Sequence, residues 1–165
     1  DVNYIYAYNI GAFSFATIVI NRDKWDGLDV SQKQALWGAQ SGVSARTVVR
    51  LYVAEAIKAR MIAKEKGIPI NNAGPDIEEF WLDFRKDETS TVNKVASDLG
   101  AKNPKEISNN FVKNIEKWEK IISSSGLSNL LNLEELNEEI LYKAEVEYEA
   151  LLQKNIFDKI NPEDL

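Results

Sequence analysis

Residues 30–66 constrain the fold most, because nothing in this stretch would stop a helix. It contains no proline, and Gly67 follows it as a typical C-terminal stop. Between Ser31 and Ala54 only three residues are charged, and apolar side chains cover most of the circumference. At 1.5 Å per residue, an unbroken helix over this range would be roughly 55 Å long, which exceeds the roughly 30 Å of a small domain.

A helix that is apolar nearly all round has to be covered on several sides. We therefore expect one very long spine helix over residues 30–66 that runs through more than one lobe, with cover that need not come from this chain alone. Gly38 and Gly42 lie four residues apart, so they allow another element to approach closely or the helix to kink.

A polar turn precedes this helix. Asp29 is well placed as the N-cap, and Gln32, three residues later, completes the pattern of a capping box. Trp25 and Leu28 flank the turn and can pack back on the start of the helix. These features belong to local structure, and nothing in them indicates catalysis.

Three stretches predict strands, so we expect an α/β fold with few strands and a mostly helical chain. Residues 2–9 carry tyrosine at alternate positions, which favours either a half-buried strand or the wall of a ligand cleft. Residues 14–21 are nearly all apolar and β-branched, which is typical of a strand covered by helices on both faces of its sheet. Residues 68–71 give a third, short strand.

The rest of the chain predicts helices. Residues 76–99 and 103–125 carry apolar side chains at helical spacing. The serine-rich residues 123–129 are the best linker in the sequence. We therefore divide the chain into residues 1–125 and a C-terminal helical extension, residues 126–165, whose last helix has a Glu-rich outer face.

Composition narrows the functional classes. The net charge is −6, and residues 71–165 hold eleven Lys and Arg against twenty Asp and Glu. This acidic half argues against a nucleic acid as partner, because phosphate binding needs a basic surface. Cysteine and histidine are both absent, which removes the thiol nucleophile, the usual general base and the commonest ligands of transition metals. We therefore expect no enzymatic activity, no cofactor and no metal site.

The segment FATIVINRDKWDGLDVSQKQAL, residues 15–36, resembles the signature stretch of the extracytoplasmic solute receptors of tripartite ATP-independent periplasmic (TRAP) transporters. Members of that family show an apolar strand that ends in Asn, then Lys, Trp and Asp, then Leu, a cap and a Gln inside a new helix. The corresponding residues here are Ile20, Asn21, Lys24, Trp25, Asp26, Leu28, Asp29, Val30, Ser31 and Gln34. The likeness continues through the long helix and the later helices, over roughly residues 1–122.

The resemblance implies the C-terminal portion of a two-lobed periplasmic-binding-protein-like fold. Such a receptor lies in the periplasm, closes its lobes on a small organic acid and delivers this carboxylate to the TRAP membrane subunits. The arginine that clamps the carboxylate lies in a strand upstream of this chain. The expected partners are therefore the solute, the membrane subunits and the upstream N-terminal half of the same receptor.

The resemblance also points to candidate ligand-binding residues. In many members the segment just before the apolar strand contributes to the cleft, often with a Thr-x-His or Gly-Trp sequence. Here Tyr8, Asn9, Gly11 and Phe13 occupy that segment and match neither pattern. We expect the side chain of Asn9 or Tyr8 to hydrogen-bond the solute, directly or through water.

Two other functional classes stay open from the sequence. The chain could be a helical protein-interaction or adaptor domain that uses the long helix and the acidic C-terminal helix. An enzyme that relies on tyrosine and carboxylates is the third class, although the sequence offers no catalytic constellation for it.

Overall fold

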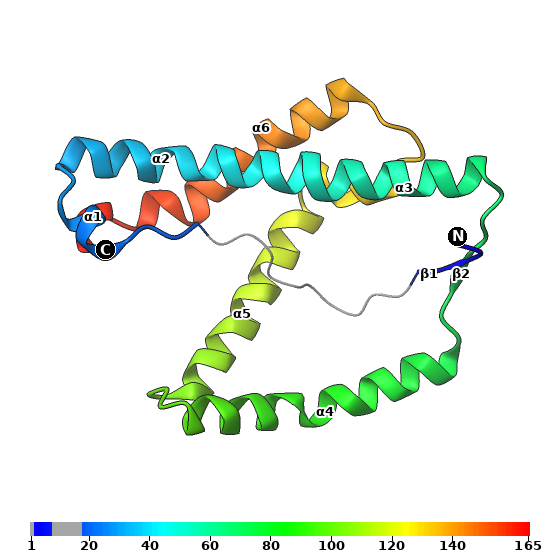
Figure 1. Cartoon of the computed structure of the whole chain (residues 1–165), viewed down its shortest axis with the longest axis horizontal. Coiled ribbons are helices and arrows are strands. Elements are labelled where there is room, and N and C mark those ends of the chain that lie inside the picture. Colours follow the sequence, from blue (N-terminus) through cyan, green and yellow to red (C-terminus); the bar gives the residue numbers. More distant parts are fainter. Residues whose placement is uncertain (1, 8–17) are drawn as a thin grey trace. The chain divides into compact units, whose positions relative to one another are not determined.

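The computed structural model describes residues 2–7 and 18–165 and is mostly helical with few strands, in agreement with the expectation from the residue patterns along the chain. The described chain forms two compact units (Figure 1). The sheet unit contains residues 2–7 and Gly67–Ser125, and the spine unit contains residues 18–66 and Gly126–Leu165.

The spine helix is continuous. Helix α2 (Val30–Arg46), the π-helical segment η1 (Thr47–Val53) and helix α3 (Ala54–Glu65) follow one another without a break, and they form the rod that runs from light blue through cyan to green in Figure 1. Its start is capped as the sequence indicates, since Asp29 accepts from the Gln32 amide at 2.9 Å and Gln32 Oε1 accepts from the Asp29 amide at 3.0 Å.

The polar turn before the spine helix is partly helical. Helix α1 (Arg22–Asp26) begins after Asn21, whose side chain accepts a hydrogen bond from the Lys24 amide at 3.2 Å. The described part of the strand expected over residues 14–21, residues 18–21, is not a strand. In the described part of the chain the sheet consists of Ile5–Ala7 and Ile70–Asn72, so residues 18–20 have no strand beside them with which to form ladder hydrogen bonds.

Helix α6 (Glu138–Asn155) packs along the spine helix in the antiparallel direction. Ser41 bonds Gln153 and Arg50 bonds Glu145, so rising numbers on one helix meet falling numbers on the other. Gly42 faces α6 closely, because a Cβ there would lie 3.1 Å from Glu149 Oε1. The core of the unit lies between these helices and the 3-10 segment η2 (Gly126–Asn132), and its largest fully buried apolar side chains are Ile57, Leu141 and Val49.

The spine helix is covered on one side only by the described chain. Its remaining apolar side chains stay exposed, among them Val30, Leu36, Val43, Leu51, Tyr52, Met61 and Ile62. The sequence indicated cover on several sides. The difference arises because α6, with the short segments η3 (Phe157–Lys159) and η4 (Pro162–Asp164), is the main cover that the spine unit offers.

The sequence-based division of the chain and the observed units share the boundary at 125/126 but differ in what they group. The spine helix packs with residues 126–165, whereas the sequence placed it with residues 1–125. Long-range packing decides this grouping, and a single sequence carries little direct signal for it.

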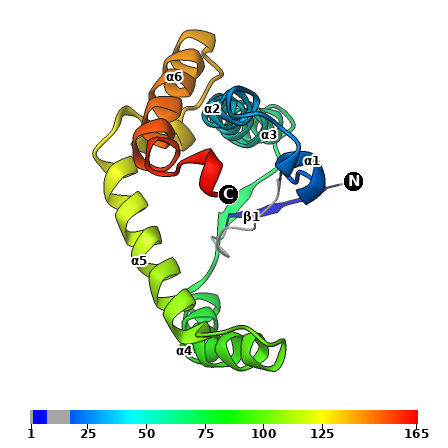
Figure 2. The ribbon, with the colours of Figure 1, turned by 90° about the vertical axis from the view of Figure 1, so that its left-hand side faces the viewer.

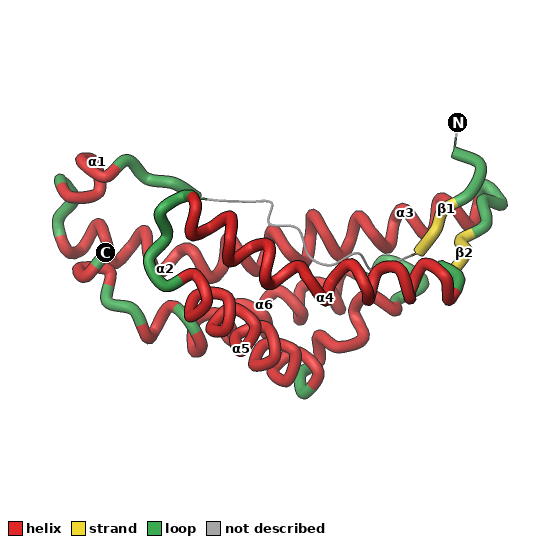
Figure 3. The backbone as a smooth tube through the Cα atoms, turned by 90° about the horizontal axis from the view of Figure 1, so that it is seen from below, coloured by secondary structure: helices red, strands yellow, loops and turns green. Residues whose placement is uncertain are grey.

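The sheet unit has a two-stranded parallel sheet and two long helices. Strands β1 (Ile5–Ala7) and β2 (Ile70–Asn72) pair in register, with Ile5 opposite Ile70. Helices α4 (Pro75–Asp98) and α5 (Pro104–Ser123) are joined side to side by a hydrogen bond from Ser108 Oγ to Asn93 Oδ1 at 2.6 Å. Figure 2 and Figure 3 show the same elements from two further directions.

The described residues of the sheet unit contain no fully buried apolar side chain. Every buried hydrophobic residue of the described chain belongs to the spine unit. Helix α5 has a strongly amphipathic sequence, yet Phe111 on its apolar stripe is 66% exposed. Phe80 and Phe84 of α4 are exposed as well. The sheet unit therefore has apolar faces without a core to bury them.

Candidate functional site

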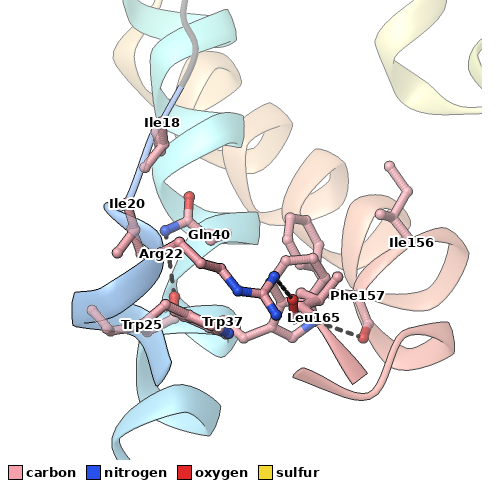
Figure 4. Close-up of a pocket in the computed structure, with 10 residues that line it drawn as sticks. Ile18, Ile20, Arg22, Trp25, Trp37, Gln40, Ile156, Phe157 and Leu165 are labelled. Atoms are coloured by element: carbon pink, nitrogen blue, oxygen red, sulfur yellow. Dashed lines mark hydrogen bonds between the residues drawn. The ribbon is translucent and has the colours of Figure 1, made fainter. Parts of the chain in front are cut away.

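The four ligand-binding residues predicted from the resemblance, Tyr8, Asn9, Gly11 and Phe13, lie outside the described residues. Their role stays a prediction. The described chain offers a different candidate, a pocket in the spine unit near the start of the spine helix (Figure 4).

This tryptophan pocket has a volume of about 440 Å³ and opens to solvent. Three parts of the chain line it: the segment around α1, the first turns of α2, and the C-terminal segment after α6. The lining residues are Ile18, Ile20, Arg22, Trp25, Leu36, Trp37, Gln40, Ile156, Phe157 and Leu165. Eight of these ten side chains are hydrophobic, so the pocket suits an apolar ligand body.

Trp37 ties the two sides of the pocket together. Its indole Nε1 donates to the Phe157 carbonyl oxygen at 3.1 Å, and its ring meets the Phe157 ring edge to face at a centroid distance of 5.0 Å. These contacts join residues 120 positions apart in the sequence. Such aromatic pairs contribute about 0.5–1.5 kcal/mol beyond burial, so Trp37 and Phe157 hold the pocket in shape.

Trp25 is the more buried of the two tryptophans, with 8% of its surface exposed. Its Nε1 has no hydrogen-bond acceptor among the described residues. The Lys33 ammonium lies over its ring at 5.6 Å from the centroid, a cation–π contact. A buried donor without an acceptor lowers the free energy of unfolding by about 1–3 kcal/mol, and the Nε1–H group of Trp25 is such a donor among the described residues.

Arg22 is the charged side chain among the described residues that line the pocket. Its Nε donates to Asp26 Oδ2 at 3.1 Å, and its Nη1 donates to the Leu165 carbonyl oxygen at 2.5 Å. Figure 4 shows the Arg22 side chain lying across the pocket toward Leu165. Arginine has five N–H donors, so these two bonds leave further donors for a ligand.

A second polar cluster fastens the spine helix to α6. Arg50 donates to Glu145 and Glu138, and these hydrogen bonds raise the pKa of the Arg50 guanidinium, with Glu138 as the larger cause. Nearby, buried Ser41 donates to Gln153 Oε1 at 2.9 Å, and Gln153 Nε2 donates to Asp158 at 2.5 Å. These groups satisfy one another, so we assign the cluster a structural role.

The sheet unit has a polar depression of about 520 Å³ where α4 meets the start of α5. Its lining includes Lys86, Lys94 and Lys105, of which Lys86 is paired with Asp83 at 2.5 Å. The lysine side chains are exposed to solvent, which weakens any attraction they exert on an anion.

The sequence singled out Trp25 as local packing and did not identify Trp37, Phe157 or Arg22 as parts of one site. A signal was available in part, since Trp37 is an aromatic residue on a helix that needs cover. The partner of Trp37 could not be read from the sequence, because it lies in a distant segment.

Neither a metal site nor a membrane span is found in the described part of the chain. No group of three His, Cys, Asp or Glu side chains is arranged there as metal ligands would be. Among the helices of residues 18–165, none combines the length and the apolar character needed to cross a bilayer.

Comparison with known proteins gives no relative: no protein-family model, no curated protein and no solved structure matches this chain.

Proposed function

We propose that this chain is the C-terminal portion of a two-lobed periplasmic receptor that captures a small organic acid and delivers it to the membrane subunits of a TRAP-type transporter. The observation that carries the proposal is the sheet unit, whose described residues have exposed apolar faces and no buried apolar side chain. A unit of this kind needs a complementary body, and the upstream half of the receptor is the partner we propose.

The parallel strand pair supports this proposal. Parallel sheets occur almost only with both faces covered, and a two-stranded sheet is at best marginally stable alone. Here β1 and β2 pair in parallel, and the side chains of β2 are exposed. Further strands from the upstream half would extend this sheet and bury its faces.

The spine helix supports it in a second way. It is unbroken over α2, η1 and α3, and much of its apolar surface stays exposed in the described chain. In a two-lobed receptor such a helix runs through both lobes, and the upstream half covers its free faces. Lobe closure is then a hinge motion, and binding of the solute shifts the populations of the open and closed states.

The proposed chemistry is binding without catalysis. Tyr8 or Asn9 would hydrogen-bond the solute, and an arginine of the upstream half would pair with its carboxylate. Neither role requires a histidine or a cysteine, and the sequence has neither. Metal, cofactor and nucleic acid have no part in this proposal.

Thermal unfolding of the intact receptor with a panel of small organic acids tests the function. A ligand at 100 times its Kd stabilises a protein by about 2.7 kcal/mol, which raises the Tm of a 150–250-residue domain by roughly 5–10 °C. Sugars and amino acids serve as comparison ligands. If no acid in the panel raises the Tm, the receptor proposal fails.

Calorimetry on variants of the intact receptor then locates the site. Asn9→Ala or Tyr8→Ala should weaken binding of the acid that raises the Tm, whereas Asn3→Ala is the matched control outside the predicted segment. Unchanged affinity for both Asn9→Ala and Tyr8→Ala would remove these residues from the site and leave the receptor function itself standing.

A helical protein-interaction domain is the second candidate, favoured by the exposed apolar stripe of α5. Hydrogen exchange in the intact protein separates the two. A receptor protects the amides of β1 and β2 within a larger sheet, whereas an interaction domain leaves them in rapid exchange until a partner binds α5.

A further inference from the structure

The described residues that line the tryptophan pocket all belong to the spine unit, and the receptor proposal gives this pocket no role. Its volume of about 440 Å³ falls within the roughly 300–1,000 Å³ of small-molecule pockets. Apolar walls with a few fixed polar groups are also typical of such pockets. The pocket thus has the size and lining of a ligand site.

The walls of the pocket are apolar. Leu36, Trp37, Ile156 and Phe157 offer aliphatic and aromatic surface from two elements that the Trp37–Phe157 contacts hold together. A ligand that buries an apolar chain or ring against these residues would gain free energy in proportion to the apolar area removed from water.

Arg22 gives the pocket a partner for an anionic group. It is the charged side chain among the described residues that line the pocket. Arg22 presents donors beyond the two that its hydrogen bonds use, and a guanidinium pairs well with a carboxylate.

The two tryptophans of the pocket differ in their hydrogen bonding. Trp37 Nε1 has an acceptor in the Phe157 carbonyl oxygen, whereas Trp25 Nε1 is buried and has no acceptor among the described residues. Buried polar groups in folded proteins nearly always have a partner.

We propose that the tryptophan pocket binds a medium-chain fatty acid, with its carboxylate at Arg22 and its alkyl chain against Trp37 and Phe157. This is a second site, separate in residues from the proposed solute site at Tyr8 and Asn9. It does not depend on the receptor function, because every residue that carries it belongs to the spine unit.

Isothermal calorimetry on the intact protein with decanoate tests the proposal, and two probes divide the ligand into its parts. Decanol keeps the chain and lacks the charge, and acetate keeps the charge and lacks the chain. We expect one decanoate per protein, weaker binding of decanol and no detectable binding of acetate.

Two variants, each with a matched control, test where the ligand binds. Ile18→Glu puts a charge on the pocket wall, and Val19→Glu is its matched control, because Val19 is 85% exposed and does not line the pocket. Arg22→Gln removes the cation, and Arg85→Gln is its control in the sheet unit, where Arg85 is paired with Glu88. Circular dichroism of each variant checks that the helices are intact.

We expect Ile18→Glu to weaken decanoate binding about fourfold or more, because Ile18 is 56% exposed and the change removes part of the apolar wall rather than burying a charge. Arg22→Gln should weaken it about three- to fivefold, as for a partly exposed ion pair. The two control variants should bind like the unmodified protein. The proposal is overturned if decanoate does not bind, if decanol binds as tightly as decanoate, or if Ile18→Glu and Val19→Glu bind alike.

Discussion

Replacing Ile57 by alanine tests where the core of the spine unit lies. Ile57 is 0% exposed and is the largest fully buried side chain of the described chain. The change removes three carbon atoms, which at about 0.8 kcal/mol per buried methylene is a loss of about 2.4 kcal/mol. The cavity left behind raises the expected loss to about 3–4 kcal/mol.

Ile62→Ala is the matched control, because Ile62 lies on the same helix, α3, and is 49% exposed. Ile62→Ala removes the same three carbon atoms from a half-exposed position. About half of the burial free energy of these carbons is therefore lost, and no cavity forms. The better helix propensity of alanine offsets about 0.4 kcal/mol of this loss. We therefore expect Ile62→Ala to cost less than about 1 kcal/mol.

Urea unfolding of this 165-residue chain measures both values. Tryptophan fluorescence reports on the spine unit through Trp25 and Trp37 and on the sheet unit through Trp81 and Trp118. The variants can be compared if the m value stays constant. The expected difference between Ile57→Ala and Ile62→Ala is roughly 2–3 kcal/mol. Equal losses would refute the reasoning, since they would mean that the outer face of α3 is packed as tightly as the inner one.

Three further predictions concern the spine helix and its cover. Gly38→Ala should raise the free energy of unfolding by about 1 kcal/mol through helix propensity. Gly42→Ala should raise it by less, because Glu149 must move aside. Denaturant unfolding of both variants measures this difference, and an equal increase would contradict the close approach of α6. Hydrogen bonds from the Gln32 amide and then the Ser31 hydroxyl lower the pKa of Asp29. The ionised Asp29 therefore stabilises the fold at pH values above its pKa in the unfolded chain, and this stabilisation is lost as the pH falls through its pKa in the folded chain. Asp29→Asn should remove this part of the pH dependence of Tm, and an unchanged pH profile would contradict the prediction. Arg50→Met should lower the Tm by leaving Glu145 without its cation, and the double variant Arg50→Met/Glu145→Leu should recover much of the loss; a further fall in the double variant would show that Glu145 has another essential partner.

Part of the fold could be predicted because its causes are local. The capping box at Asp29 and Gln32 depends on residues three apart, and the unbroken spine helix follows from the absence of helix-stopping residues in one stretch. Helix α1 escaped prediction because five residues are too few to show a helical period.

The spine helix also shows where the inference from apolarity went too far. The helix is unbroken, as its sequence indicates, but the described residues of its own unit hold no strand, and α6 is its main cover. Apolar residues around the whole circumference show that several faces favour burial. They do not show which partner provides the cover, and this is why the two-lobed receptor stays a proposal.

The sequence by itself determined the long helices, the capped start of the spine helix and the acidic composition without cysteine or histidine, since these depend on residue type and on neighbours a few positions away. Tertiary structure alone decided that α6 lies on the spine helix, that Ser41 is buried against Gln153, and that Trp37 meets Phe157 to form a pocket. These contacts join residues more than a hundred positions apart, and their formation depends on which apolar faces meet when the chain becomes compact.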